Sequence, residues 1–154
     1  GIARDSVNAY FHTISILQPM HGLREPAYLV GDFRVADRTM LAPQRTIRGL
    51  FSEQGYPHFA GVGRYRQIVN IPEGLGAEKL ILDPGEVSGC IRVLVNGKLV
   101  ATRLWPPYEV DISGAARGGS NEIIVEVAGT VANLYSKEQR PYGLKGRGAV
   151  WVLA

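Results

Sequence analysis

Residues 90–111 have the sequence Cys90-Ile-Arg-Val-Leu-Val-Asn96-Gly97-Lys-Leu-Val-Ala-Thr-Arg-Leu-Trp105-Pro-Pro-Tyr108-Glu-Val-Asp111. Asn96-Gly97 predicts a two-residue hairpin turn, because such turns need positive φ angles that Asn and Gly tolerate. Residues 91–95 alternate in the period-two pattern of a strand. The returning strand ends at Pro106-Pro107, since proline has no N–H to donate to a ladder. The segment therefore predicts a β-hairpin that sets the register of its neighbours.

Further strands are predicted where aromatic, β-branched and aliphatic residues gather between Gly and Pro turns. They cover residues 27–35, 62–71, 78–83, 122–128 and 148–153. Residues 36–46, 49–61 and 129–147 are predicted as loops, and Ser113 is predicted to cap a single helical turn. About eight short strands with hardly any helix predict an all-β fold, a β-sandwich of the jelly-roll type.

Two sheets packed face to face would bury one apolar set. The predicted core residues are Val69, Leu80, Leu82, Ile91, Val93, Val95, Ile124 and Val127. Trp151 is predicted to join them, and the single cysteine, Cys90, is predicted to be a small buried apolar residue.

A length of 154 residues suits one domain. We therefore expect a single β-sandwich domain over residues 1–154, with residues 1–25 as a leading segment from a preceding domain. The abrupt start and end suggest a piece of a longer protein.

Charge and hydropathy argue against two classes of partner. The net charge of +3 comes from Lys and Arg spread along the whole chain, whereas nucleic-acid binders cluster their basic residues. No apolar run approaches the roughly 18 residues of a membrane helix. We therefore expect no nucleic-acid partner and no membrane span.

The sequence does not resemble an enzyme. Glycoside hydrolysis normally uses two carboxyl groups across the scissile bond, and the acidic residues, among them Asp32, Glu53, Asp83 and Glu109, show no spacing that would pair them. The three histidines lie too far apart in sequence for a local zinc motif. No catalytic residue and no required cofactor are predicted.

Sugar binding needs fewer groups than sugar hydrolysis: a flat aromatic ring beside a few polar groups is enough. Three loops offer such groups. The predicted carbohydrate-binding residues are Trp105, Tyr108, Arg103, Tyr56, His58, Asn133 and Tyr135. The alternative for Trp105 and Tyr56 is that they fill the edge of the core, as large aromatic residues often do.

Several short blocks occur in an order that is similar to a known family. They include Gln54-Gly-Tyr-Pro-His-Phe-Ala-Gly61, Pro106-Pro-Tyr-Glu-Val-Asp-Ile112 and Asn121-Glu-Ile-Ile-Val-Glu-Val127. From about Pro26 onward the chain resembles the galactose-binding-like β-sandwich at the C-terminal end of α-L-rhamnosidase-type glycoside hydrolases. It resembles more distantly the sugar-binding jelly roll of β-galactosidase and β-glucuronidase relatives.

The resemblance implies a non-catalytic carbohydrate-binding module of a larger glycoside hydrolase, and this module would bind plant or microbial polysaccharide. The catalytic carboxylates of the family's parent enzymes lie in a separate barrel domain, which would be this module's partner. A secreted or periplasmic location, within a larger bacterial enzyme, is expected. Sandwiches of this type often hold a structural calcium ion, and no ligands are assigned for it here. The alternative is an accessory domain that packs on a catalytic domain, binds no sugar, and leaves an apolar patch exposed in isolation.

Overall fold

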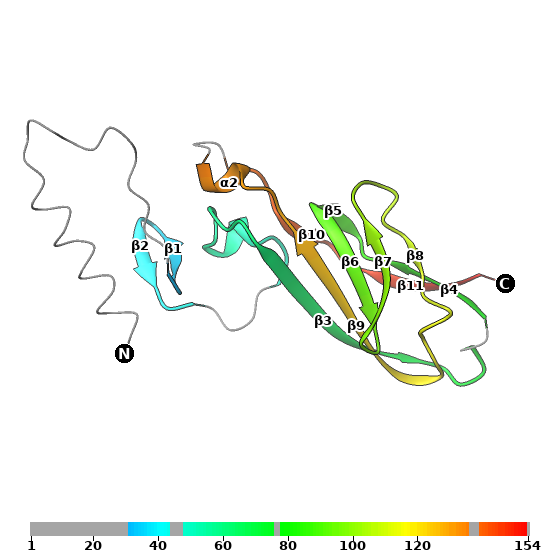
Figure 1. Cartoon of the computed structure of the whole chain (residues 1–154). Helices are drawn as coiled ribbons and strands as arrows, with labels where there is room; N and C mark the ends of the chain where they lie inside the picture. The colour runs from blue at the N-terminus through cyan, green and yellow to red at the C-terminus, as the bar shows by residue number, and fades with distance from the viewer. Residues whose placement is uncertain (1–30, 44–47, 76–77, 136–138, 154) are drawn as a thin grey trace, which may run out of the picture. The chain divides into compact units, whose positions relative to one another are not determined.

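The computed structural model describes residues 31–43, 48–75, 78–135 and 139–153 (Figure 1). The chain divides into two compact units, residues 1–44 and 45–154. Because residues 1–30 lie outside the described part, the predicted single sandwich over 1–154 and the leading segment 1–25 stay predictions.

The described part of the first unit is a small hairpin. Strand β1 (Arg34–Ala36) pairs antiparallel with β2 (Thr39–Leu41). Asp37 and Arg38 both have positive φ, 49° and 60°, which is the geometry of a two-residue hairpin turn. Of the predicted strand 27–35, residues 34 and 35 are strand, residues 31–33 are not, and residues 27–30 lie outside the described part. The prediction of a loop over 36–46 was wrong for residues 39–41, because Asp-Arg is a weak turn signal that sequence reading overlooks.

The second unit is an antiparallel β-sandwich, as the sequence predicts. Its larger sheet has four strands in the order β3 (Val62–Ile71), β9 (Gly119–Ala128), β6 (Cys90–Val95) and β7 (Lys98–Arg103) (Figure 1). A three-stranded sheet has the order β11 (Ala149–Leu153), β4 (Lys79–Asp83) and β8 (Val110–Asp111). Strand β10 (Gly143–Lys145) pairs with β5 (Glu86–Ser88).

Short helical segments complete the unit. A 3₁₀ turn spans Ser52–Gln54, and α2 spans Ala132–Tyr135. The predicted loops over 49–61 and 129–147 therefore contain a 3₁₀ turn, a short helix and strand β10. Ser113 does not cap a helix: its Oγ accepts a hydrogen bond from the Leu80 N–H (2.9 Å) and donates to Asp111 Oδ1 (2.6 Å).

The predicted hairpin is confirmed. Strands β6 and β7 pair around Asn96 (φ 52°) and Gly97 (φ 80°). The Asn96 amide nitrogen also donates to the Ala115 carbonyl and to Asn121 Oδ1, both at 2.9 Å. The turn is thereby tied to the loop that leads into β9.

The core lies between the two larger sheets and contains most of the predicted residues. The predicted residues found buried are Leu80, Leu82, Ile91, Val93, Val95 and Val127. Val69 is half-buried and packs against them. Ile124 was wrongly predicted, because Ile123 and Val125 are the buried residues of its strand and alternate residues face opposite sides of a sheet.

Trp151 and Cys90 also differ from prediction. In the edge strand β11, Val150 packs against the core, so the next residue along the strand, Trp151, points outward and is 56% exposed. Cys90 is only half-buried, and its Sγ lies 3.5 Å from the Leu104 carbonyl. Its position at the first residue of β6 leaves one side open.

A cluster of aromatic rings closes one end of the core. The Phe51 ring centroid lies 5.6 Å from that of Phe59, 5.3 Å from that of Tyr65 and 5.6 Å from that of Tyr142. Phe51 also lies so close to the backbone of Gly63 that a Cβ built there would be 1.7 Å from the ring. A glycine in β3 is therefore required for Phe51 to reach the core.

We predict that Gly63→Ala lowers the free energy of unfolding by about 1–3 kcal/mol, the usual cost of overpacking. Gly114→Ala is the matched control, because a Cβ at Gly114 meets no atom within 4 Å. Urea unfolding measures both. Phe51→Leu in the Gly63→Ala background should restore part of the loss. Equal stability of the two single variants would contradict the packing described.

Candidate functional site

The four-stranded sheet gathers the predicted sugar-binding segments at one end. Its register places Val62 and Cys90 opposite Ala128, and Arg103 opposite Ile91. The chain before Val62, after Ala128 and after Arg103 therefore leaves the sheet at the same end (Figure 1). We call segments 49–61, 104–109 and 129–135 the loop end.

The predicted residues form two groups at the loop end. Tyr56, His58, Asn133 and Tyr135 adjoin β3 and β9, whereas Arg103, Trp105 and Tyr108 adjoin β7. Strands β3 and β7 are opposite edges of the sheet, so about 14 Å separates them at the usual strand spacing. The seven predicted residues therefore lie at one end of the sheet but do not form a single compact cluster.

A hydrogen bond joins two segments of the first group. His58 Nδ1 lies 2.8 Å from the Asn133 backbone oxygen, which ties the 49–61 segment to α2. The Asn133 side chain is 6% exposed and is occupied by the backbone of Arg140, donating to its carbonyl (2.9 Å) and accepting from its N–H (3.0 Å). Tyr135 is 67% exposed, and Tyr56 packs partly on the core. Asn133 thus supports the site, and Tyr135 presents a ring to solvent.

The second group contains an exposed tryptophan. Trp105 is 70% exposed, so the alternative that it fills the edge of the core was wrong. Tyr108 packs partly on the core, and its hydroxyl donates to the Gly89 carbonyl (3.0 Å). The Arg103 guanidinium contacts only its neighbouring backbone among the bonds described, through Nη1 to the Thr102 carbonyl (3.3 Å). Of this group, Trp105 is the most exposed, whereas Arg103 is half-buried opposite Ile91.

Two tyrosines, the half-buried Tyr65 and the buried Tyr142, hold the loop end to the body. The Tyr65 hydroxyl donates to the Gly49 carbonyl (2.6 Å) and accepts from the Leu144 N–H (3.0 Å). The Tyr142 hydroxyl donates to the Val127 carbonyl (3.1 Å) and also contacts the Gly61 carbonyl. Burial raises the pKa of both phenols above 10.0, although backbone N–H groups offset part of the increase. Sequence reading missed these anchors, because their partners are distant in the chain.

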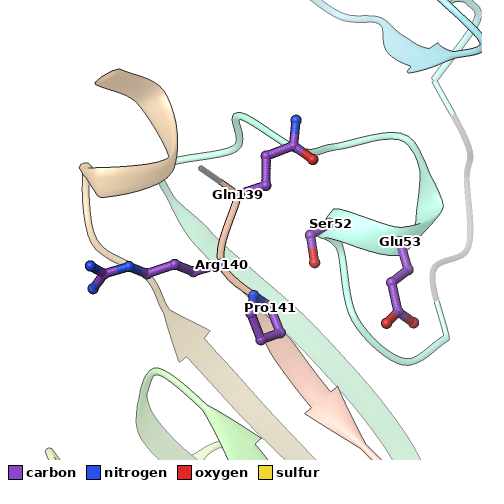
Figure 2. Close-up of a pocket in the computed structure, with 5 residues that line it drawn as sticks. All are labelled: Ser52, Glu53, Gln139, Arg140 and Pro141. Carbon is purple, nitrogen blue, oxygen red and sulfur yellow. The ribbon is translucent and has the colours of Figure 1, made fainter. Parts of the chain in front are cut away.

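A polar hollow lies beside the first group. It has a volume of about 340 Å³ and is lined by Ser52, Glu53, Gln139, Arg140 and Pro141. Figure 2 shows the Arg140 guanidinium on the far side of the 139–141 backbone from Ser52 and Glu53. Ser52, Glu53 and Gln139 contribute a hydroxyl, a carboxylate and an amide to its lining. No sequence motif indicated it.

The described residues contain no group of three or more His, Cys, Asp or Glu side chains that could hold a metal ion. The structural calcium ion therefore stays a prediction without ligands. Among the helices of the same residues, none is long and apolar enough to cross a membrane.

The chain is similar to small parts of several proteins described as glycoside hydrolases. No protein-family model matches the chain. A candidate β-glucuronidase of Formosa agariphila is 29% identical over 98 residues, which are 62% of this chain and 8% of that protein. The rhamnosidase from Novosphingobium sp. PP1Y is 25% identical over 79% of this chain and 14% of its own, with a TM-score of 0.55.

A glycosyl hydrolase family 2 member from Bacteroides cellulosilyticus DSM 14838 has the same fold, with a TM-score of 0.55 at 15% identity. It covers 83% of this chain and 19% of its own. The chain therefore spans only a small part of each of these proteins. The resemblance to rhamnosidase-type and β-glucuronidase-type hydrolases is confirmed at this level, and the galactose-binding-like class stays a prediction.

We predict a pH-dependent loss of stability that depends on Tyr65. Because its pKa is raised in the folded state, the stabilisation is complete below pH 10 and is lost as pH rises through the folded-state pKa. Tyr65→Phe should cost about 1 kcal/mol at pH 7, through the lost hydroxyl bonds. The difference between wild type and variant should narrow above pH 10. Urea unfolding from pH 7 to 11 measures this.

The control is Trp151→Phe, because Trp151 is exposed and its side chain does not titrate in this range. That variant should follow the wild-type pH profile. A constant difference between wild type and Tyr65→Phe across the range would contradict the assignment.

Proposed function

We propose that this chain is a non-catalytic carbohydrate-binding β-sandwich of a larger glycoside hydrolase, and that it binds plant or microbial polysaccharide at the loop end. In this proposal its partners are the polysaccharide and a catalytic domain of the same protein, in a secreted or periplasmic setting. The galactose-binding-like class, named from the sequence, is part of the proposal.

One observation carries the proposal: Trp105 is 70% exposed at the end of a β-sandwich. Exposing an indole ring to water is unfavourable, and the ring can stack against the apolar face of a sugar. Arg103, two residues earlier, supplies N–H donors for hydroxyl groups. The similarity to parts of glycoside hydrolases supports saccharide as the ligand class.

The first group of loop-end residues fits an extended ligand. Tyr135 offers a second exposed ring, and the polar hollow beside it offers Glu53 and Gln139. Since about 14 Å lies between the two sheet edges at usual strand spacing, a chain of several sugar units would reach both groups. A monosaccharide would reach one.

We predict that Trp105→Ala weakens retention on the bound polymer by about tenfold, as truncation of an aromatic hot spot does. Its thermal midpoint should stay near that of the wild type, because the ring is mostly in solvent. Affinity electrophoresis against pectic, xylan and galactan polymers measures retention. Trp151→Ala is the matched control, since it removes an exposed indole from the other sheet.

Two results would contradict the proposal. One is that the wild type is retained by none of the polymers. The other is that Trp105→Ala and Trp151→Ala reduce retention equally. Tyr108→Ala is a poor test, because the Tyr108 ring packs on the core and its hydroxyl binds Gly89.

The alternative is an accessory domain that packs on a catalytic domain and binds no sugar. The observation that favours it is strand β11, an edge strand on which Trp151, Val152 and Leu153 are 56%, 42% and 48% exposed. Natural edge strands usually carry charge, proline or a bulge that prevents pairing. The sequence of β11, Ala149-Val-Trp-Val-Leu153, has neither charge nor proline.

If β11 is a docking surface, Trp151→Arg should reduce binding of a hydrophobic dye and self-association of the isolated chain. Its stability should change by less than about 0.5 kcal/mol, because the side chain faces solvent. Leu99→Arg is the control, as Leu99 is 52% exposed on the other sheet. Sedimentation and dye fluorescence that respond equally to both variants would argue against a docking role for β11.

A further inference from the structure

The outward face of the four-stranded sheet carries a row of paired charges. Arg64 lies directly opposite Glu126 in the register, and Glu126 lies opposite Arg92. Arg66 forms an ion pair with Glu122 on the same two strands, β3 and β9. We call these five residues the arginine ladder.

Glu126 is held between two guanidinium groups. Its Oε1 accepts from Arg64 Nε (3.1 Å) and Nη2 (2.6 Å), and its Oε2 accepts from Arg92 Nε (2.9 Å) and Nη2 (2.5 Å). The Glu126 side chain is 4% exposed, whereas Arg64 and Arg92 are 64% and 57% exposed. The hydrogen bonds from Arg64 and Arg92 lower the pKa of Glu126, so it remains ionised at neutral pH.

This arrangement leaves binding capacity on the arginines. A guanidinium has five N–H donors, and Arg64 and Arg92 each use donors from two nitrogens on Glu126. The remaining donors face solvent. Three arginines against two carboxylates leave the ladder with one net positive charge. Because Glu126 already fixes Arg64 and Arg92, a ligand need not order them, which removes part of the usual entropic cost of binding.

We propose that the arginine ladder binds carboxylate-bearing saccharides at a second surface, separate from the loop end. The inference rests on the proposed function for saccharide as the ligand, and it adds the acidic class and the place. A guanidinium matches a carboxylate through two parallel hydrogen bonds. The next row of the same face contains half-buried Ile124 and Leu94, which supply an apolar floor for a sugar ring.

Nucleic acid is the other polyanion that arginines bind, through phosphate. The ladder lacks the clustered excess of positive charge typical of that class, since each arginine in it has a carboxylate partner. Duplex DNA is therefore included as a competing probe.

The test uses the full chain and measures Kd by calorimetry for polygalacturonate, its fully methyl-esterified form, neutral galactan and duplex DNA. The Arg64→Lys/Arg92→Lys double variant keeps both charges near Glu126 and removes the fork geometry. It should bind polygalacturonate about tenfold more weakly, the effect of losing hydrogen bonds to a charged group. Arg147→Gln, an exposed arginine outside the ladder, is the control and should change Kd less than about twofold.

The esterified polymer should bind the wild type more weakly than polygalacturonate. Equal affinity of wild type and double Lys variant for polygalacturonate would overturn the inference, as would tighter binding of DNA than of polygalacturonate. One outcome separates the inference from the proposed function: Trp105→Ala weakens binding of neutral galactan, but the double Lys variant leaves the Kd for polygalacturonate unchanged. In that case the inference fails and the proposed function stands. If the wild type binds none of the saccharides, both fail.

Discussion

The register of β9 is the constraint from which the rest of the sandwich follows. Strand β9 pairs with β3 over ten residues and with β6 on its other side. At its start, Asn121 is fully buried and its amide bonds the Arg117 backbone, the Gly119 carbonyl and the Asn96 side chain. A shift of one residue would break these bonds and turn Glu126 toward the core. Burying that charge without its arginines would cost several kcal/mol.

Both surfaces to which we assign a ligand derive from this register. The alternation that buries Val125 and Val127 places Glu126 on the outward face between Arg64 and Arg92. The same pairing, continued from β6 to β7, brings the ends of β3, β9 and β7 level, so that the loop-end segments emerge together. The ladder follows from this register, because Glu126 is 4% exposed and both of its carboxylate oxygens pair with the more exposed guanidinium groups of Arg64 and Arg92.

The features that could be predicted from the sequence are those that a few adjacent residues determine. Asn96-Gly97 determines its turn locally, and the alternation of residues 62–71 determines a strand whatever it pairs with. The errors arise where the sequence alone does not determine which alternate residues of a strand face the core, because packing against another segment decides it. Trp151 and Val150 are both apolar, so only the packing of Val150 on the core shows that the indole faces solvent.

The candidate site shows the same division between local and long-range information. The sequence located the loop segments, because turns and aromatic residues mark them. It did not show that the Asn133 amide is occupied by Arg140, or that Phe51 requires Gly63. Those contacts form only when segments distant in the chain come together, and no local pattern encodes them.

The hydrogen bonds that tie the loop end to the body use groups that are then not available to a ligand. The hydroxyls of Tyr65, Tyr108 and Tyr142 bond backbone carbonyls, and His58 bonds the backbone of Asn133. Because these groups are already bonded, fewer of them can bond a ligand. The same bonds hold the loops in place before a ligand arrives, which reduces the entropy lost on binding. A saccharide at this end would therefore depend on stacking against exposed rings more than on a dense hydrogen-bond network. Trp105, which the fold leaves outside its core, is the residue best placed to supply that contact.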